Sequence, residues 1–303
     1  METIPDGVLD RLTGMDGSEL TACAATPLGG GLGVATAGVA RLDAAYRAGR
    51  AEGTFSVIRK TFRPVSSGRH AEAARDPRHW AFWRREVLAY ASGVLPSGPG
   101  LRAPVCFGHG DDVVYLEDVE GTTESPVLAA ARLGRWQAAA AAPSAPWLSG
   151  HQLAQRVAAG GLDWSAVDAD PRMPALWERR AELLEALAGL PQVLSHGDFH
   201  HANIIATAGD TVVLDWGTLG LAPTGADLAH YLLGHPDGTD PAHVADLVDA
   251  YLDGSRGRFT RADAQTGLCA TAALTGASRV HWRLAQGLPV PDGYVDLVSA
   301  MAP

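Results

Sequence analysis

Lysine is almost absent from this sequence. Of its 24 basic residues, 23 are arginine and one, Lys60, is lysine. A bias toward arginine can come from the base composition of the coding sequence and then carries no functional meaning. An ammonium group is nevertheless more compact and more strongly hydrated than a guanidinium, so the two are not interchangeable at every site. The one retained lysine is therefore a candidate for a position that arginine cannot fill.

Cysteine and long apolar runs are scarce as well. The three cysteines, Cys23, Cys106 and Cys269, lie far apart and form no CxxC pair. This argues against a disulfide framework or a zinc cluster and is typical of a reducing compartment. No apolar run reaches the roughly 18–20 residues that a membrane-spanning helix requires. The N-terminal stretch METIPDGVLDRL lacks the pattern of a secretion signal, so we expect a cytoplasmic protein with no membrane partner.

The chain has fewer basic than acidic residues, and the difference is unevenly distributed along it. The chain has 34 acidic and 24 basic residues and a net charge of −10, so nucleic acid is a poor general partner. The first 110 residues hold 13 basic and 10 acidic residues, whereas the rest hold 11 and 24, and residues 181–255 contain eleven acids and no basic residue. A solvated acidic surface explains this stretch. The alternative is a site that attracts metal ions or a polycationic substrate.

The first third of the chain is patterned for strands. A hydrophobic fraction of 47% is sufficient for a large core. Near the N-terminus, β-branched and aromatic residues follow a glycine cluster, a pattern typical of strands. Later, Pro77 begins a segment whose aromatic residues recur at helical spacing. Trp80 and Trp83 belong to this segment, and we assign them to the core. The predicted strands span 34–42, 54–62 and 113–116, with a turn at 51–53, and the predicted helix spans 77–91.

The pattern changes after a polar segment at 117–121, which is suited to hinge two lobes. Beyond it helical patterns dominate, and two short strands flank a stretch rich in His and Asp. The predicted helices span 128–142, 174–190 and 261–286, the strands span 192–194 and 211–214, and a Pro/Ser loop spans 143–150. We therefore expect an α+β protein that is rich in strands first and mainly helical afterwards.

The densest group of reactive side chains is His-Gly-Asp-Phe-His-His-Ala-Asn at 196–203, followed by Asp215 at the end of a predicted strand. Asp198, on a loop after a strand, can accept a proton from an attacking hydroxyl. Asn203 and Asp215 offer hard oxygen ligands of the kind that suit Mg²⁺. A base and two magnesium ligands are what phosphoryl transfer requires, because that reaction depends on positioning and charge neutralisation.

The spacing H-x-D-x-x-x-x-N matches the kinase catalytic loop, in which the Asp is the base and the Asn holds a metal ion. That template also requires a downstream Asp, a Lys on a strand of the first lobe and a Glu on a helix. Asp215 meets the first requirement, and Lys60 is the one lysine able to meet the second. Glu86, on the predicted helix, meets the third. All of these residues occur in the expected chain order.

With these residues in place, the chain resembles the aminoglycoside phosphotransferase / choline kinase family of small-molecule kinases. SHGDFHHANII and VVLDWGTLGLAPTGADLAHYL carry the resemblance, with Asp-Trp-Gly for the Asp-Phe-Gly of protein kinases and Gly197 for the arginine of His-Arg-Asp. It extends from about Gly29 to Leu233. It implies a bilobal protein-kinase-like α+β fold with an antiparallel-sheet N-lobe and a mainly helical C-lobe. Residues 1–118 would be the nucleotide-binding lobe, and 119–303 the catalytic and substrate-binding lobe.

The resemblance also implies residue roles. Lys60 would contact the α- and β-phosphates of ATP and pair with Glu86. Asp198 would be the catalytic base, and Asn203 and Asp215 would hold Mg²⁺.

Further roles concern the nucleotide. The segment 113–119 resembles the hinge whose backbone groups bind adenine, and it contains Glu117 and Val119. Gly31 and Gly33 would lie near the phosphates, although their glycine cluster lacks the G-x-G-x-x-G-x-V spacing of protein kinases.

The histidines of the loop admit another interpretation. His196, His200 and His201, together with Asp198, resemble the clustered ligands of a metallohydrolase. That interpretation leaves the other matched residues without a role. In a kinase, His196 would brace the catalytic loop, and His200 and His201 would pack or contact substrate. Asp227, in GADLAHYL, would cap or brace its helix.

The expected activity is ATP- and Mg²⁺-dependent transfer of a phosphoryl group to a hydroxyl of a small molecule. The acidic second part of the chain fits a cationic acceptor such as an aminoglycoside antibiotic. A metabolic kinase of choline, sugars or amino alcohols is the alternative. A catalytically silent nucleotide-binding protein would lack a base or a metal ligand, and none is missing. The sequence contains no activation-loop motif such as Ala-Pro-Glu, and this absence argues against a protein substrate.

Overall fold

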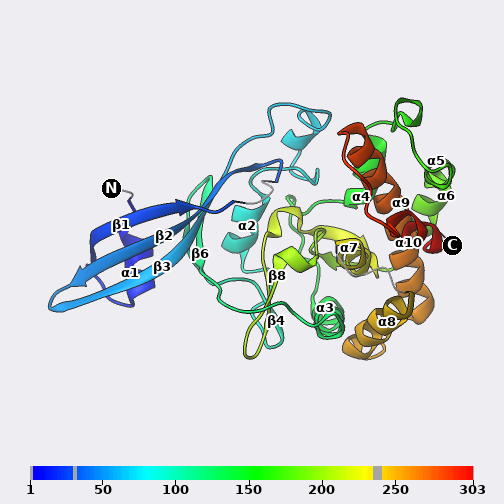
Figure 1. Ribbon diagram of the computed structural model, residues 1–303. Coiled ribbons are helices and arrows are strands. Elements are labelled where there is room, and N and C mark those ends of the chain that lie inside the picture. Colours follow the sequence, from blue (N-terminus) through cyan, green and yellow to red (C-terminus); the bar gives the residue numbers. More distant parts are fainter. Residues whose placement is uncertain (1–2, 30–32, 235–240, 303) are drawn as a thin grey trace.

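The computed structural model describes residues 3–29, 33–234 and 241–302. The chain forms two parts of different secondary structure (Figure 1). A long antiparallel sheet, with the N-terminus beside it, forms one end, and a group of helices that includes the C-terminus forms the other. The expected α+β class, with strands first and helices afterwards, is confirmed.

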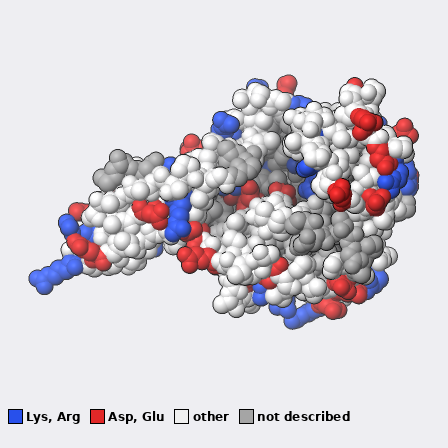
Figure 2. Space-filling model, viewed as in Figure 1, with Lys and Arg blue, Asp and Glu red and all other residues white. Residues whose placement is uncertain are grey.

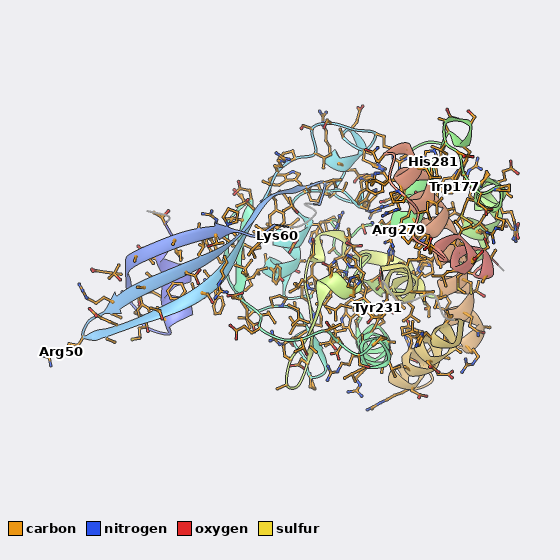
Figure 3. All side chains as sticks on the ribbon, viewed as in Figure 1. Arg50, Lys60, Trp177, Tyr231, Arg279 and His281 are labelled. Atoms are coloured by element: carbon orange, nitrogen blue, oxygen red, sulfur yellow. The ribbon has the colours of Figure 1, made fainter. Side chains whose placement is uncertain are left out.

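The first part is built on a five-stranded antiparallel sheet in the order β1-β2-β3-β6-β5. Its register places Lys60, on β3, between Val39 of β2 and Val114 of β6. Lys60 therefore lies on an interior strand near the end of the sheet that faces the helices (Figure 3). The strands are β1 (Glu19–Pro27), β2 (Thr36–Ala48), β3 (Ala51–Phe62), β5 (Cys106–His109) and β6 (Val113–Glu117).

Two helices cover opposite faces of this sheet. On one face, α1 (Asp6–Thr13) packs in a cluster that contains Tyr115, and on the other, α2 (Arg85–Ser92) packs in a cluster that contains Val114 and Leu116. Neighbouring residues of β6 thus point to opposite sides, as the pleat of a strand requires. Phe62 belongs to the α2 cluster. Lys60, two residues before it, therefore faces α2 as well.

The helix predicted at 77–91 is too long, because the observed α2 begins only at Arg85. Residues 77–84 form turns instead. The two tryptophans that suggested a longer helix pack in different places, Trp80 with Ala74 and Ala81 and Trp83 against the α2 cluster. Their three-residue spacing therefore reflects two separate contacts of a folded loop and not one helical face.

The second part is organised around α9 (Arg261–Ala285), the longest helix in the described chain. The helix predicted at 174–190 is two helices, because the chain breaks at Arg179 between α5 and α6. The other helices of this part are α3 (Pro126–Ala139), α4 (Gln152–Ala158), α5 (Arg172–Glu178), α6 (Arg180–Ala188), α7 (Ala226–Gly234), α8 (Pro241–Ser255) and α10 (Tyr294–Ala300).

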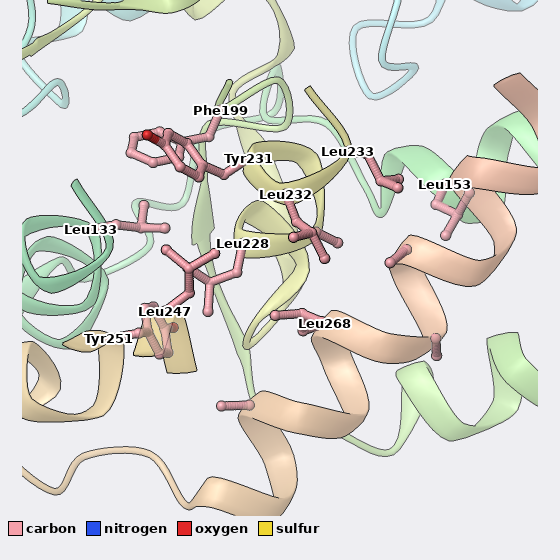
Figure 4. Close-up of a cluster of buried hydrophobic side chains, with 14 of the residues drawn as sticks. Leu133, Leu153, Phe199, Leu228, Tyr231, Leu232, Leu233, Leu247, Tyr251 and Leu268 are labelled. Carbon is pink, nitrogen blue, oxygen red and sulfur yellow. The ribbon is translucent and has the colours of Figure 1, made fainter. Parts of the chain in front are cut away.

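The main hydrophobic core lies among these helices (Figure 4). Leu228 and Leu232 of α7 and Leu268 of α9 are each at most 2% exposed. Phe199 and Tyr231 stack at a tilt, with ring centroids 5.8 Å apart. This contact ties the loop that carries the candidate base to the core.

Short strands position the reactive loop. β7 (Gln192–Ser195) pairs with β10 (Gly220–Pro223), and β9 (Thr211–Val213) pairs with both β8 (Ile204–Ala206) and β4 (Leu101–Arg102). The strands predicted at 192–194 and 211–214 are confirmed to within a residue. The first strand of the sheet, β1, was not predicted. No helix in the described residues is both long and apolar enough to cross a bilayer.

Candidate active site

His196 links the reactive loop to the strand end before Asp215, and it is fully buried. Its Nδ1 accepts a hydrogen bond from the Asp198 N–H at 3.2 Å, and its Nε2 lies 2.8 Å from the Leu214 carbonyl oxygen. Because Nδ1 accepts, Nε2 carries the proton and donates to Leu214. Burial lowers the pKa of His196, so the ring stays neutral. This geometry is that of a residue that braces the loop.

Asp227, on α7, anchors the same loop from the other side. Its carboxylate is buried and accepts four hydrogen bonds, from Ser195 Oγ at 2.9 Å, the His196 N–H at 3.0 Å, the Gly197 N–H at 2.9 Å and Gln137 Nε2 at 2.8 Å. Three of the four donors belong to the start of the reactive loop. Asp227 therefore braces this loop, where the sequence suggested that it caps or braces its own helix.

Gly197 explains one departure from the protein-kinase pattern. Its φ of 78° lies in the left-handed region, which side chains rarely adopt. A Cβ here would lie 2.8 Å from the Thr218 carbonyl oxygen and 2.9 Å from the side-chain amide of Gln152. An arginine has no room at this position, so glycine is required by the fold of the loop.

Asp198 follows directly, and its side chain is 41% exposed. Asn203 Nδ2 donates to the Asp198 backbone oxygen at 3.0 Å, and His200 Nε2 lies 3.4 Å from Asp198 Oδ2. Burial alone would raise the pKa of Asp198, but its hydrogen bond with His200 opposes this effect, and the pKa lies well below its usual value. The carboxylate is therefore ionised at neutral pH and can accept a hydrogen bond from a hydroxyl.

Lys60, Glu86 and Asp215 form one charged cluster between the two parts of the molecule. Lys60 Nζ lies 2.7 Å from Glu86 Oε2 and 2.9 Å from Asp215 Oδ1. The side chains of Lys60 and Glu86 are 8% and 1% exposed, whereas that of Asp215 is 41% exposed. The lysine and glutamate thus form the buried base of the cluster, and Asp215 faces the solvent side.

The pKa values in this cluster follow from burial and charge. Burial alone would lower the pKa of Lys60, but the carboxylates of Glu86 and Asp215 outweigh it and raise the pKa above its ordinary value. Burial raises the pKa of Glu86 to about 7, against the attraction of Lys60. Lys60 lowers the pKa of Asp215, against the effect of burial. Lys60 is therefore a permanent cation, and Asp215 is ionised at neutral pH.

The backbone at Asp215 is held in an unusual conformation. Its φ of 60° and ψ of 68° lie in the left-handed region, which non-glycine residues seldom occupy. The next residue, Trp216, is fully buried, donates from Nε1 to the Val213 carbonyl oxygen at 2.7 Å and meets the His196 ring edge-on. These contacts hold the turn that presents the Asp215 carboxylate.

A cavity of about 380 Å³ opens beside this cluster. Lys60, Glu86, Asn203 and Asp215 line it. The remaining lining is largely apolar, from Leu28, Val39, Ile58, Leu116, Ile205 and Leu214. The cavity thus has a charged end and an apolar end, as expected of a pocket for a nucleotide.

The residues predicted to contact nucleotide fall into three groups. Gly33 and Val119 line the cavity, whereas Gly31 lies outside the described residues. Glu117 also lines it, but its carboxylate is held by the Arg102 guanidinium at 2.6 and 2.9 Å. A contact of Glu117 with adenine would therefore come from its backbone.

The donor set at the charged end fits Mg²⁺. The amide nitrogen of Asn203 is occupied by the Asp198 backbone oxygen, so the amide oxygen is the atom suited to a metal. Asp215 adds an ionised carboxylate at the cavity wall. Both are hard oxygen ligands, and Mg²⁺ takes few of these from protein when phosphates supply others.

The metallohydrolase interpretation finds no comparable site. Among the described residues, no three or more His, Cys, Asp or Glu side chains group in a way that could hold a metal ion. His196 is committed to the backbone of the loop and of Leu214. His196 thus has a structural role in the loop.

Residues 112–263 match the model of the phosphotransferase enzyme family. The chain belongs to this family. The matched region begins at the last strand of the sheet and includes the reactive loop, Asp215 and Asp227. The resemblance inferred from the sequence is thereby confirmed, and the chain is a phosphotransferase. No curated protein matches the chain significantly.

Solved structures of other small-molecule kinases share the fold of this phosphotransferase. An amicoumacin kinase in complex with AMP-PNP and Ca²⁺ has 14% identity and a TM-score of 0.55 over 92% of this chain and 90% of its own. A putative fructosamine-3-kinase from Thermobifida fusca has 19% identity and a TM-score of 0.54 over 98% and 99%. Choline kinase from Cryptosporidium parvum has 9% identity and a TM-score of 0.53 over 92% and 87%. The expected bilobal, kinase-like fold is confirmed.

The sequence did not identify one buried residue that supports the site of this phosphotransferase. Arg85, next to Glu86, is fully buried and donates five hydrogen bonds to backbone carbonyl oxygens, those of Pro77, His79, Trp80, Trp147 and Gly217. It thus ties α2 to the segment that follows Asp215. In the sequence, Arg85 is one of many arginines and nothing distinguishes it.

Proposed function

We propose that this phosphotransferase transfers the terminal phosphoryl group of ATP to a hydroxyl of a small molecule and requires Mg²⁺. The observation that carries the proposal is the shared cavity of Lys60, Glu86, Asn203 and Asp215, with Asp198 joined to it through Asn203. These residues are separated by up to 155 positions in the sequence, and their convergence supports a common role.

The apolar end of the cavity suits adenine. Val39 and Ile58 come from the sheet, and Ile205 and Leu214 come from the second part, so a planar base would be held between the two parts. The backbone at Glu117 and Val119 borders the same end. We place the boundary between the nucleotide-binding lobe (1–118) and the catalytic lobe (119–303) at this segment.

The charged end suits the phosphates. Lys60 offers a cationic ammonium group whose position is held by Glu86, and it would contact the α- and β-phosphates. Asn203 and Asp215 would hold Mg²⁺, which when bound neutralises charge on the phosphates. Because the cluster is preformed, little reorganisation is needed when charge develops in the transition state.

Asp198 acts on the acceptor. Its ionised, partly exposed carboxylate accepts a hydrogen bond from the acceptor hydroxyl and orients the oxygen toward the terminal phosphorus atom. As the phosphorus–oxygen bond forms, Asp198 takes the hydroxyl proton, and ADP leaves with the bond electrons. Asn203 and His200 hold the Asp198 carboxylate in place during this step.

The identity of the acceptor is open between two groups of compounds. The acidic composition of the second part is an argument for a cationic antibiotic such as an aminoglycoside, and the alternative is a metabolite of the choline, sugar or amino-alcohol type. None of the three cysteines, all of which lie in the described part of the chain, is disulfide-bonded, which fits the cytoplasm, where ATP is available.

The test is ADP release from ATP with a panel of antibiotics, amino alcohols, sugars and hydroxy acids. We expect acceptor-dependent ADP release with Mg²⁺ and none after chelation with EDTA, and isothermal titration should show binding of ATP with Mg²⁺. Failure to bind ATP, or equal ADP release with and without Mg²⁺, would contradict the proposal.

A further inference from the structure

A second pocket, of about 60 Å³, borders Asp198 and shares no lining residue with the nucleotide cavity. Arg156 of α4, His230 of α7 and Arg279 of α9 line it together with Asp198. If Asp198 is the base, as proposed above, the acceptor hydroxyl lies within hydrogen-bond reach of it. The surroundings of Asp198 outside the nucleotide cavity are therefore those of the acceptor.

Arg156 is held in this pocket by neutral groups. Its guanidinium lies over the Trp80 ring, 4.0 Å from the ring centroid. With the Gln152 amide oriented to satisfy its neighbours, Gln152 Oε1 accepts from Arg156 Nε at 3.1 Å and Nη2 at 2.7 Å, and Gln152 Nε2 donates to the Gly197 carbonyl oxygen at 2.6 Å. Arg156 is thus positioned in advance and connected to the catalytic loop.

Arg279 stands where two pockets meet. It lines the small pocket beside Asp198 and also a larger one, of about 440 Å³, formed by α7, α9 and α10. Figure 3 shows Arg279 on the helical side of the gap that separates it from Lys60. Trp282, which is 56% exposed, and Tyr294 line the larger pocket with it.

The charge of this region differs from that of the second part as a whole. Asp198 is the one carboxylate among the described residues that line the small pocket with Arg156 and Arg279. Burial and the two arginines lower the pKa of His230 to about 3, against the attraction of Asp198, so this histidine is neutral. Apart from Asp198, which attracts Arg156, the charged groups that line the small pocket are the guanidinium groups of Arg156 and Arg279.

Three acids of the second part have partners outside the small pocket, and Asp292 lines the larger pocket together with Arg279 and Arg283. Asp227 is committed to the catalytic loop, and Glu182 and Asp249 pair with arginines on the surface of the helices. Figure 2 shows basic atoms on the helical side of the hollow between the two parts, with acidic atoms in its depth. The overall acidity of the chain thus does not describe the neighbourhood of Asp198.

We propose that the acceptor carries an anionic group, a carboxylate or a phosphate, that is bound by Arg156 and Arg279 while its hydroxyl lies at Asp198. The inference rests on the proposed function and names the acceptor class of the same site. Arginine is suited to this task because its planar donors match the two oxygens of a carboxylate or phosphate. A cationic acceptor would be repelled by both guanidinium groups.

Three probes that share one skeleton and differ in charge test this. They are 4-(hydroxymethyl)benzoate, 1,4-benzenedimethanol and 4-(aminomethyl)benzyl alcohol, and their aromatic ring suits the Trp282 side of the larger pocket. Isothermal titration with ADP and Mg²⁺ present gives the affinity of each. We expect the carboxylate to bind at least about tenfold more tightly than the neutral diol, and the amine to bind most weakly.

Arginine variants then assign the effect to the pocket. In Arg156→Gln and Arg279→Gln, the preference for the carboxylate should fall to within about twofold, and Arg279→Lys should restore part of it. Arg261→Gln, at the far end of the same helix and paired with Asp249, is the matched control and should keep the full preference. The affinity for ADP should be unchanged in all four variants.

Each other outcome has a definite meaning. Equal binding of the three probes, no binding of the carboxylate, tighter binding of the amine, or a preference that survives both glutamine variants would overturn the inference. If the variants lose ADP binding while probe binding is kept, the arginines serve the nucleotide, and the inference is wrong. Loss of ADP binding by the unmodified protein would instead refute the proposed function.

Discussion

Lys60 Nζ and Glu86 Oε2 lie 2.7 Å apart, and the two residues come from β3 and α2. The pair is almost completely buried, although charged groups are costly to bury unless they are paired. The single lysine of the sequence is thus fixed in the wall of the cavity that Asn203 and Asp215 also line. Its retention among 23 arginines has a physical reason, because a compact ammonium meets two carboxylates in a confined space.

Replacing Lys60 with arginine keeps the charge and tests the shape requirement. Because the larger guanidinium cannot occupy the same space between Glu86 and Asp215, we expect kcat/KM for ATP to fall about 100-fold or more in Lys60→Arg. Steady-state ADP release measures this. Arg59→Lys, one step away on the opposite face of β3, is the control and should stay within a few-fold of the unmodified protein. An unchanged rate in Lys60→Arg would make the single lysine a coincidence.

Arg85 and Arg84 form a natural pair of variants. Lysine at position 85 can replace at most three of the five hydrogen bonds that Arg85 donates. We expect Arg85→Lys to lose about 3 kcal/mol or more in the free energy of unfolding, since unsatisfied buried carbonyls cost about 1–3 kcal/mol each. Urea denaturation measures this. Arg84→Lys, whose partner Asp111 is exposed, should change stability by less than about 1 kcal/mol, and equal effects would refute the role of Arg85.

Asp227 holds the reactive loop through three of its four hydrogen bonds, and the fourth comes from Gln137. In Asp227→Asn one oxygen becomes a donor that faces other donors, so we expect a loss of about 2–4 kcal/mol in stability. At temperatures where the variant is still folded, kcat should fall while the affinity for ADP is kept, because the loop that carries Asp198 is displaced. Asp246→Asn, on the exposed side of α8, is the control. Normal kcat in folded Asp227→Asn would contradict the bracing role.

The Glu117–Arg102 pair makes the stability of the folded state depend on pH. The Arg102 hydrogen bonds, with help from the Val105 N–H, lower the pKa of Glu117 against the effect of burial. A depressed pKa stabilises the folded state above the ordinary pKa of a glutamate, and the stabilisation is lost as the pH falls through the folded-state value. The difference in Tm between the protein and Glu117→Gln should therefore shrink on acidification from pH 7 toward pH 3.5. A difference that is constant or grows would contradict this assignment.

The sequence grouped the candidate site residues better than it identified the residues that support them. Lys60, Glu86, Asn203 and Asp215 were grouped because phosphoryl transfer needs specific side chains at specific spacings, and the structure brings all four to one cavity. Asp198 lies beside them, and the roles of the five residues stay predictions. The strands and helices that carry them were placed to within a few residues, with α2 as the main error.

The contacts that support the candidate site could not be predicted from the sequence. Arg85 donates exclusively to backbone carbonyls, and such bonds leave no pattern in the side chains around them. Arg156 and Arg279 are 123 residues apart, and their convergence beside Asp198 depends on how α4 and α9 pack. The acidic composition of the second part suggested a cationic acceptor instead, because the net charge of a whole segment does not give the charge of one pocket within it.

In the proposed reaction, Asp198 promotes phosphoryl transfer from ATP to an acceptor bound beside it. The most direct measurement is transfer of label from [γ-³²P]ATP to an acceptor found in the ADP-release panel, by the unmodified protein and by Asp198→Asn. We predict labelled product with the unmodified protein and a rate about 10²–10⁴-fold lower with Asp198→Asn, whose ATP affinity stays normal. Near-equal transfer by Asp198→Asn would contradict the account.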